Sequence, residues 1–421
     1  MRLSYHRDVL PNGVRVVTES SRDSGSVSLG FWLGVGSCLE PRELTGVSHF
    51  IEHILFKGTE RRSAFEIANA LESVGGSLDA FAGRENTAFV ARCLTEHVGR
   101  AVGVISDMLA RPAMRNKDIE LEKNVIFEEI RSLEDTPEDV AHELLAGSVW
   151  NANPVGKSVL GTTASVGSFT REKVWPFFRS HYVAPSTIVA ASGNVDHDHL
   201  VDSVSRMLKI PSSPPPEGSK AFKSGVGRVS NASRKISQCY ICLGAEATPY
   251  ENPRRHAAML LSLVVGGGMT SRLFQRVREQ EGLAYTVYSS CEFYRSTGIF
   301  YIFLAVDPKN ARKAIARVVK EIKRLKTRGL ARGELRSVKQ QLRCGLLLGL
   351  ESSAARMNRL ARHELYLGAY RSVDDSLASI DRVKEEEIIE EARLLLRPSS
   401  LSLVTVGPSS TDFPSKADLS A

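Results

Sequence analysis

The order of predicted secondary structure repeats once along the chain, and this repeat limits the fold more than any other feature of the sequence. Residues 210–227, IPSSPPPEGSKAFKSGVG, are rich in proline, serine and glycine and break both helical and strand periodicity. They divide the chain almost in half. We therefore predict two homologous parts, residues 1–209 and 228–421, joined by a linker at 210–227.

Both parts run through the same kinds of segment in the same order. In the first part, strand and helix patterns alternate through 26–36 (strand), 47–55 and 63–75 (helices), 86–94 (strand) and, after further helices, 187–196 (strand). In the second part the corresponding patterns occupy 236–244 (strand), 256–267 and 271–282 (helices), 298–307 (strand) and, after basic helices, 401–408 (strand). An offset of about 210 residues also aligns glycines and an arginine, which suggests a duplication.

Composition excludes several classes of protein. With 42% hydrophobic and 24% charged residues, the chain is typical of a globular protein, and no apolar run is long enough to span a membrane. Residues 309–343 contain 13 Lys and Arg and two Glu, so this stretch carries a net charge of +11, which exceeds the net charge of +7 of the whole chain. Because apolar residues recur there at helical spacing, we interpret this stretch as the solvated face of helices and expect no nucleic-acid partner.

The segment VSHFIEHIL, residues 47–55, places two histidines and a glutamate within an apolar helix pattern. At 3.6 residues per turn, His49, Glu52 and His53 share one face. Histidines at i and i+4 can both bind one zinc ion, whereas Glu52 would lie beside the metal and could accept a proton from a water that the metal activates. The alternative is three polar groups on an ordinary amphipathic helix.

A catalytic zinc site needs a third protein ligand from elsewhere in the chain. The best candidates are Glu122 and Glu129 in LEKNVIFEEIRSLEDTPEDVAHELL, two helical turns apart and therefore on one face. One could bind the metal while the other supports a ligand.

The second half of the chain offers an internal comparison. The offset of about 210 carries His49, Glu52 and His53 onto Met259, Ser262 and Leu263. A helix that needed only to pack would have this apolar character in both halves. The polar trio in the first half therefore indicates a function beyond packing.

HFIEH, followed by Glu129 in VIFEEI, resembles peptidase family M16, the pitrilysin family, whose HxxEH motif reverses HExxH. The resemblance extends over nearly the whole chain through LPNGVRVVTE, GFWLGVGSCLEP, GVSHFIEHILFKGT, GGSLDAFAGRENTAF, NPVGKSVLGT and GGGMTSRLFQRVREQEGLAYTVYS. In length and in its two halves, the chain is most similar to the short subfamily of bacterial processing-protease-like enzymes and mitochondrial processing peptidase β subunits.

This resemblance implies a role for each residue of the site. One Zn²⁺ per chain would be bound by the metal ligands His49, His53 and Glu129, with Glu52 as the base and Glu122 as an accessory acid. In the second half, Arg278 and Tyr285 match the family's substrate-holding arginine and tyrosine, seven residues apart.

The segment SLDAFAGRENTAF matches the family's edge strand, which pairs its backbone with an extended peptide. The substrate-binding residues there would be Asp79, Ala80, Phe81 and Ala82. Asp79 stands where Asn is common in the family, and Ala82 where Thr or Ser is common. We therefore expect the strand backbone to pair with the peptide, but not the usual side-chain contacts at these two positions.

Together these features predict an α+β, pitrilysin-like metallohydrolase fold of two homologous halves, each an antiparallel-rich sheet with helices packed on one face. The expected function is a zinc-dependent endopeptidase that cleaves unfolded peptides or protein precursors, acts on an extended peptide and forms a homodimer. The first half would be catalytic, and the second would supply substrate-binding residues.

Two alternatives remain open. The first is a catalytically inactive or chaperone-like subunit that binds peptides without cutting them. The second is a mitochondrial presequence-processing subunit of the β type. Because the N-terminal residues enter a strand pattern at once, we expect no targeting segment, no membrane association and a bacterial cytoplasmic location.

Overall fold

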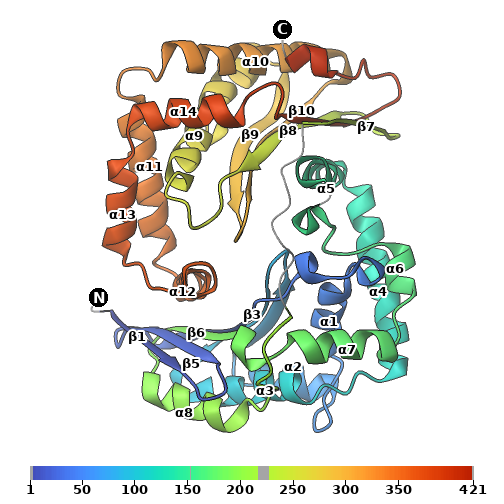
Figure 1. The fold of residues 1–421 in the computed structure, drawn as a ribbon, viewed down its shortest axis with the longest axis vertical. Coiled ribbons are helices and arrows are strands. Elements are labelled where there is room, and N and C mark those ends of the chain that lie inside the picture. Colours follow the sequence, from blue (N-terminus) through green and yellow to red (C-terminus); the bar gives the residue numbers. More distant parts are fainter. Residues whose placement is uncertain (1–2, 152, 217–226, 420–421) are drawn as a thin grey trace. The chain divides into compact units, whose positions relative to one another are not determined.

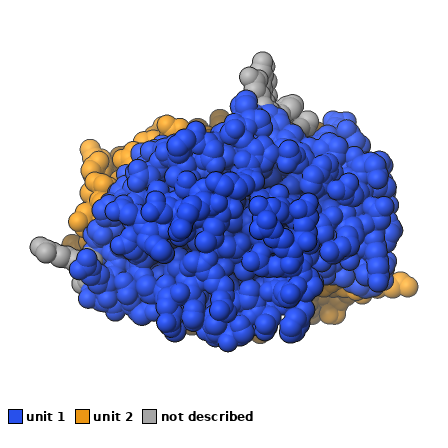
Figure 2. All heavy atoms as spheres, turned by 90° about the horizontal axis from the view of Figure 1, so that it is seen from below, with its two compact units in different colours: residues 1–131, 157–220, 348–370 blue, residues 132–156, 221–347, 371–421 orange. Residues whose placement is uncertain are grey.

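The chain forms two structural units, each assembled from separate stretches of sequence. The computed structural model describes residues 3–151, 153–216 and 227–419. Unit 1 comprises residues 1–131, 157–220 and 348–370, and unit 2 comprises residues 132–156, 221–347 and 371–421 (Figure 2). The predicted parts, 1–209 and 228–421, are continuous stretches of sequence, whereas each unit of the structure combines three stretches. Residues 217–226 of the predicted linker lie outside the described residues.

Unit 1 is built on a six-stranded mixed sheet with the order β1-β2-β6-β3-β5-β4 (Figure 1). Strands β2 and β6 run parallel, and the other neighbours are antiparallel. The strands are β1 (Ser4–Val9), β2 (Arg15–Ser20), β3 (Ser26–Leu33), β4 (Ser77–Ala82), β5 (Thr87–Leu94) and β6 (Thr187–Gly193). All residues of β6 are buried, as expected for a central strand covered on both faces.

The helices of unit 1 lie on both faces of this sheet. They are α1 (Val47–Leu55), α2 (Ala64–Glu72), α3 (Val98–Ala110), α4 (Asn116–Asp135), α6 (Thr163–Gly167), α7 (Arg171–His181), α8 (His197–Met207) and α12 (Ser353–Leu367). All except α12 contribute to one large core with Leu29, Phe31 and Phe89 of the sheet. Helix α12 packs on the opposite face, where Met357 and Leu360 meet Trp32.

Unit 2 contains a five-stranded sheet with the order β7-β11-β8-β10-β9. Its strands are β7 (Val229–Ser233), β8 (Cys239–Ala247), β9 (Ala284–Phe293), β10 (Gly298–Val306) and β11 (Ser402–Gly407). Its helices are α5 (Pro137–Trp150), α9 (Arg255–Gly266), α10 (Ala311–Arg328), α11 (Glu334–Gly349), α13 (Val373–Arg382) and α14 (Glu385–Leu395), with a π-helical segment at Phe274–Glu279. Cys239 and Cys242 are buried free thiols in β8.

Helix α5 has the same place in unit 2 that α12 has in unit 1. It packs against β8 and β11, on the face opposite the main core of that unit. Gly244 of β8 makes room for it, because a Cβ there would lie 2.9 Å from the Leu145 side chain. Each sheet is thus covered on its second face by a helix from the other half of the sequence.

The two sheets confirm the predicted duplication. The order β2-β6-β3-β5-β4 in unit 1 corresponds strand by strand to β7-β11-β8-β10-β9 in unit 2, including the single parallel pair in each. The predicted α+β class with antiparallel-rich sheets is confirmed, and the structure adds one helix on the second face of each sheet. Among the described residues, no helix is both long and apolar enough to cross a lipid bilayer.

Candidate metal centre

Helix α1 begins where a buried carboxylate replaces the usual capping residue. Gly46, with φ of +93°, takes the left-handed conformation that lets the chain turn into the helix. The Glu40 carboxylate accepts the backbone N–H of Gly46 at 2.6 Å and that of Ser48 at 2.8 Å. These bonds satisfy amides that have no partner within the helix and fix the position of α1.

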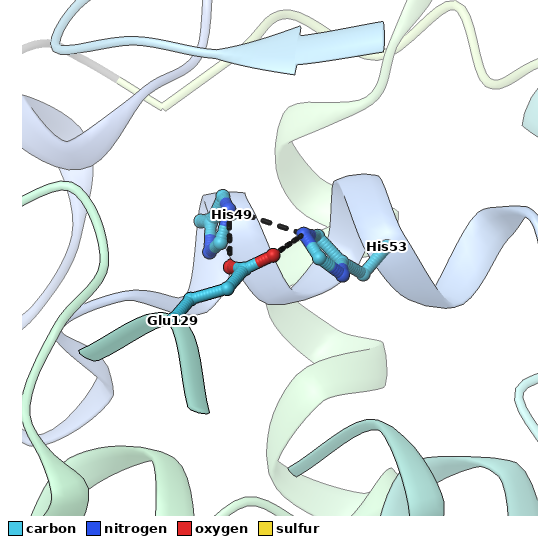
Figure 3. Close-up of side chains that lie close together, drawn as sticks. All are labelled: His49, His53 and Glu129. Carbon is cyan, nitrogen blue, oxygen red and sulfur yellow. Dashed lines mark hydrogen bonds and ion pairs between the residues drawn. The ribbon is translucent and has the colours of Figure 1, made fainter. Parts of the chain in front are cut away.

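The side chains of His49 and His53 lie together on one face of α1, and Glu129 of α4 reaches both (Figure 3). The two Nε2 atoms are 3.2 Å apart. The Glu129 carboxylate oxygens lie 3.5 Å from Nε2 of His49 and 3.6 Å from Nε2 of His53. Ligands on a tetrahedral zinc, at bonds of about 2.0–2.2 Å, are separated by about 3.3–3.6 Å. The three residues can therefore each direct one donor atom at a single metal ion, and their nitrogen and oxygen donors suit zinc.

The protonation of His49 suits a metal ligand. Burial, followed by the nearby charge of His53, lowers the pKa of His49 to about 4. Its imidazole is therefore neutral near pH 7, and a neutral ring is the form that binds metals.

His53 is positioned by Glu122 of α4, which contacts the ring nitrogen that does not face the other donor atoms. Its Nδ1 lies 2.9 Å from Oε1 of Glu122, which is only 2% exposed. Burial alone lowers the pKa of His53, but the hydrogen bond to Glu122 and the nearby carboxylates outweigh it and raise the pKa. A carboxylate on Nδ1 fixes the tautomer that leaves Nε2 free for the metal.

Glu122 is in turn paired with Lys57, whose Nζ lies 2.7 Å from Oε2. Burial raises the pKa of Glu122, but the hydrogen bonds with His53 and Lys57 outweigh it and lower the pKa. Lys57, Glu122 and His53 form one chain of contacts behind the metal centre.

Glu52 lies beside the three donor atoms without belonging to their group. Its Oε2 is 4.0 Å from Nε2 of His49, and its side chain is 13% exposed. Burial raises the pKa of Glu52, with Glu129 and Glu122 adding to the effect and His53 opposing it. A carboxylate of raised pKa beside a metal centre is suited to accept and return a proton.

The predicted edge strand lies at the end of its sheet. β4 pairs with β5 on one side, with Asp79 opposite Val90 and Phe81 opposite Ala88. Gly83 donates its N–H to Asn86, so alternation of the antiparallel pattern directs the backbone groups of Ala80 and Ala82 to the free edge. Asp79 and Phe81 are exposed.

Arg278 and Tyr285, the predicted substrate-holding pair, lie together in unit 2. The Arg278 guanidinium is 4.7 Å from the ring centre of Phe274 and 5.7 Å from that of Tyr285. Tyr285 is the second residue of β9, and its side chain is 75% exposed and so available to a ligand.

The positions on the second-half helix that correspond to His49, Glu52 and His53 carry no histidine or carboxylate. Met259, Ser262 and Leu263 lie on α9, where Ser262 is buried and accepts a hydrogen bond from Ser289 to its carbonyl at 2.7 Å. Within residues 3–151, 153–216 and 227–419, no second group of three metal-binding side chains is found.

Two residues that support the site were missed by the sequence analysis, Glu40 and Lys57. Neither belongs to a motif with metal-ligand spacing. The only signal was position, since both lie within a few residues of VSHFIEHIL in the blocks that resemble the M16 family.

Fold and site together define a protein of two like α+β units, one of which carries an HxxEH helix completed by a distal glutamate. The chain belongs to peptidase family M16. Residues 15–163 match the family described as insulinase (peptidase family M16), and residues 168–342 match the peptidase M16 inactive domain.

Relatives cover almost the full length of the chain. An uncharacterized zinc protease of Streptomyces coelicolor is 37% identical, covering 96% of this chain and 90% of the relative. The zinc protease YmxG of Bacillus subtilis is 31% identical, covering 94% of this chain and 97% of the relative. These relatives confirm the predicted resemblance.

Solved structures confirm the fold. A protease from Helicobacter pylori has a TM-score of 0.91 at 17% identity, covering 96% of this chain and all of that chain. A chain of complex III from Candida albicans has a TM-score of 0.86 at 21% identity, covering 99% of both chains.

Proposed function

We propose that this protein is a zinc-dependent endopeptidase with one zinc ion per chain, bound by His49, His53 and Glu129. The observation that carries the proposal is the spacing of the donor groups: the two histidine Nε2 atoms are 3.2 Å apart, and each lies 3.5 or 3.6 Å from one of the two Glu129 oxygens, which suits a shared metal ion. The bacterial relatives named as zinc proteases support the choice of metal.

Each residue then has a defined task. Zinc, when bound, supplies a Lewis acid that polarises the scissile carbonyl and lowers the pKa of a water. Glu52 accepts the proton of the attacking water and returns it to the leaving amine. Glu122 does not face the donor atoms but holds Nδ1 of His53, so we assign it a positioning role rather than one in proton transfer.

The substrate we propose is an extended peptide or an unfolded protein segment. The free edge of β4 offers the backbone groups of Ala80 and Ala82 for pairing with such a segment. Main-chain pairing reads few side chains, so it suits a peptidase of loose sequence preference. Asp79 and Phe81 would contribute on the exposed side of the strand.

The assignment of Arg278 and Tyr285 to substrate binding rests on the family resemblance and on their contact with each other. We propose that they hold the substrate backbone and support the charge that develops on the scissile carbonyl oxygen. The homodimer and the cytoplasmic location also remain predictions.

A subunit that only binds peptides is the competing function. It would need the free edge of β4 but neither the metal ligands nor the base. The three donor atoms and Glu52, all in place in unit 1, favour the enzyme over this alternative.

The test is cleavage of a mixed peptide library. The purified protein should cut internal bonds, lose activity with a chelator and regain it when zinc is restored. Glu52→Gln protein, handled identically, serves as the control. A protein that binds library peptides without cutting any, or cuts them equally well without metal, would contradict the proposal.

A further inference from the structure

A cavity of about 620 Å³ lies in unit 1 between α2, α3 and α8. None of the proposed zinc ligands lines it, and neither does Glu52 or the edge strand β4. The three helices belong to the layer that covers one face of the sheet (Figure 1). Its volume falls within the range of about 300–1,000 Å³ that is typical of small-molecule sites.

The lining of this cavity is strongly cationic. Six basic side chains line it, against two acidic ones, Glu66 and Asp107. The basic residues are Arg61, Arg62, Arg100, Arg111, Arg206 and Lys209. The excess of four positive charges matches the charge of a fully ionised nucleoside triphosphate.

Both carboxylates already have partners. Asp107 accepts a hydrogen bond from Thr59 at 2.7 Å, and it also pairs with Arg62 and with Arg111. Glu66 accepts the backbone N–H of Ser63 at 2.8 Å as part of the cap of α2. They therefore leave the other cations of the cavity uncompensated.

Three of those cations bond only to carbonyl groups within the described residues. Arg100 donates to the carbonyl of Ala70 at 3.4 Å, Arg206 to that of Asp202 at 3.3 Å, and Lys209 to that of Ser205 at 2.7 Å. Clustered cations without carboxylates repel one another, and a polyanion would relieve that repulsion.

Two glycines of α3, Gly99 and Gly103, line the cavity and leave space where other residues would have side chains. A Cβ at Gly99 would meet nothing within 4 Å, and one at Gly103 would meet only the Met207 sulfur, at 3.6 Å. Glycine inside a helix costs about 1 kcal/mol relative to alanine. Ala70, Val104 and Met207 add an apolar wall beside the cations.

We propose that this cavity binds a nucleoside triphosphate, with the phosphates held by Arg100, Arg206 and Lys209 and the nucleoside against the apolar wall. Guanidinium groups bind phosphate oxygens with two parallel hydrogen bonds, which suits the arginines. The limited volume favours a small ligand over a nucleic-acid strand.

The experiment is isothermal titration of the full-length protein with ATP. Arg100→Glu removes a phosphate contact, and Gly99→Leu fills part of the cavity while raising helix propensity. Each should weaken ATP binding by at least about tenfold, the value of one lost charged hydrogen bond. Lys320→Glu on α10, an exposed position in the basic stretch outside the cavity, is the matched control and should bind ATP as the wild type does.

Parallel titrations with tripolyphosphate, citrate and a short single-stranded DNA identify the chemistry. Weaker binding of all three than of ATP supports the proposal. Equal binding of tripolyphosphate would overturn the nucleoside contact, and tighter binding of DNA would overturn the small-ligand assignment. No ATP binding at millimolar concentration, or equal affinity in the wild type, Arg100→Glu and Gly99→Leu, would overturn the site itself. Thermal unfolding of each variant confirms that it is folded.

Discussion

Lys57 acts on the metal centre through two other residues. Its ammonium group faces Glu122, and Glu122 holds the Nδ1 atom of His53. A carboxylate that stays ionised makes the imidazole a stronger ligand, because it stabilises positive charge on the ring. We therefore expect the positive charge of Lys57 to raise the zinc affinity although Lys57 is not itself a ligand.

We predict that Glu122→Gln weakens zinc binding by about 10- to 100-fold, the usual effect of losing a carboxylate behind a histidine ligand. Lys57→Met, which keeps the apolar stem and removes the charge, should weaken it less. Competition with a chromophoric chelator measures both affinities.

Glu128→Gln is the control for this pair of variants. Glu128 lies next to Glu129 on α4 but is exposed and pairs with Arg131 at 2.8 Å. It should leave the affinity unchanged. If Lys57→Met also left it unchanged, the chain from Lys57 to His53 would have no role in binding.

The sequence predicted that His49, His53 and Glu129 lie together, as they do in the structure, but it did not predict the residues that support them. His49, His53 and Glu52 share a helix face by spacing alone, and Glu122 and Glu129 share another, so two faces with matching chemistry were visible. Which side of Glu122 would meet a lysine depends on how α4 packs beside α1. Helical periodicity does not contain that information.

At the level of elements, α12 is held on the sheet of unit 1 by buried charge as well as by packing. Glu364 is 2% exposed and accepts hydrogen bonds from Arg7 at 3.1 and 2.9 Å. Gly30 of β3 leaves space for the helix, because a Cβ there would lie 2.7 Å from the Met357 sulfur. The docking of α12 is therefore specific.

We predict that Glu364→Ala lowers the free energy of unfolding by about 1–3 kcal/mol, because Arg7 loses a buried partner. The loss stays below that of a fully buried pair, since the Arg7 side chain is 37% exposed and can be hydrated. Urea unfolding measures the change. Glu386→Ala on α14, an exposed position, should change the stability by less than about 0.5 kcal/mol. Equal stability of the two variants would mean that the pair does not hold α12.

The sequence does not show that α5 packs on the sheet of unit 2 or that α12 packs on the sheet of unit 1. The amphipathic pattern of each helix shows which face is buried but not which sheet it meets. The sequence analysis predicted helices on one face of each sheet, and α5 and α12 cover the other face because it is also apolar.

For the whole molecule, duplication allows the two units to specialise. Both keep the same sheet order, but only α1 carries the proposed histidine ligands, while α9 has Met259 and Leu263 at the matching positions. The internal comparison of Glu52 with Ser262 made this difference visible in the sequence. We propose that unit 1 holds the metal and that Arg278 and Tyr285 of unit 2 serve substrate binding.

If the protein is a homodimer in which Arg278 serves the metal centre of the partner, mixing two inactive variants should restore activity. Random exchange between Glu52→Gln and Arg278→Ala chains would give up to about a quarter of the wild-type activity, because half of the dimers carry one complete site. Peptide cleavage by the mixture measures this. Each variant incubated alone is the control, and no recovery would show that Arg278 does not act in trans.

The most direct test of the account compares zinc content and peptidase activity in the wild type, Glu52→Gln and His53→Ala. We predict one zinc per chain in the wild type and in Glu52→Gln, with turnover in Glu52→Gln reduced by about 10²- to 10⁴-fold, the usual contribution of a general base. His53→Ala should lose both metal and activity. Equal zinc loss in the two variants, or full activity of Glu52→Gln, would contradict the proposed division between ligands and base.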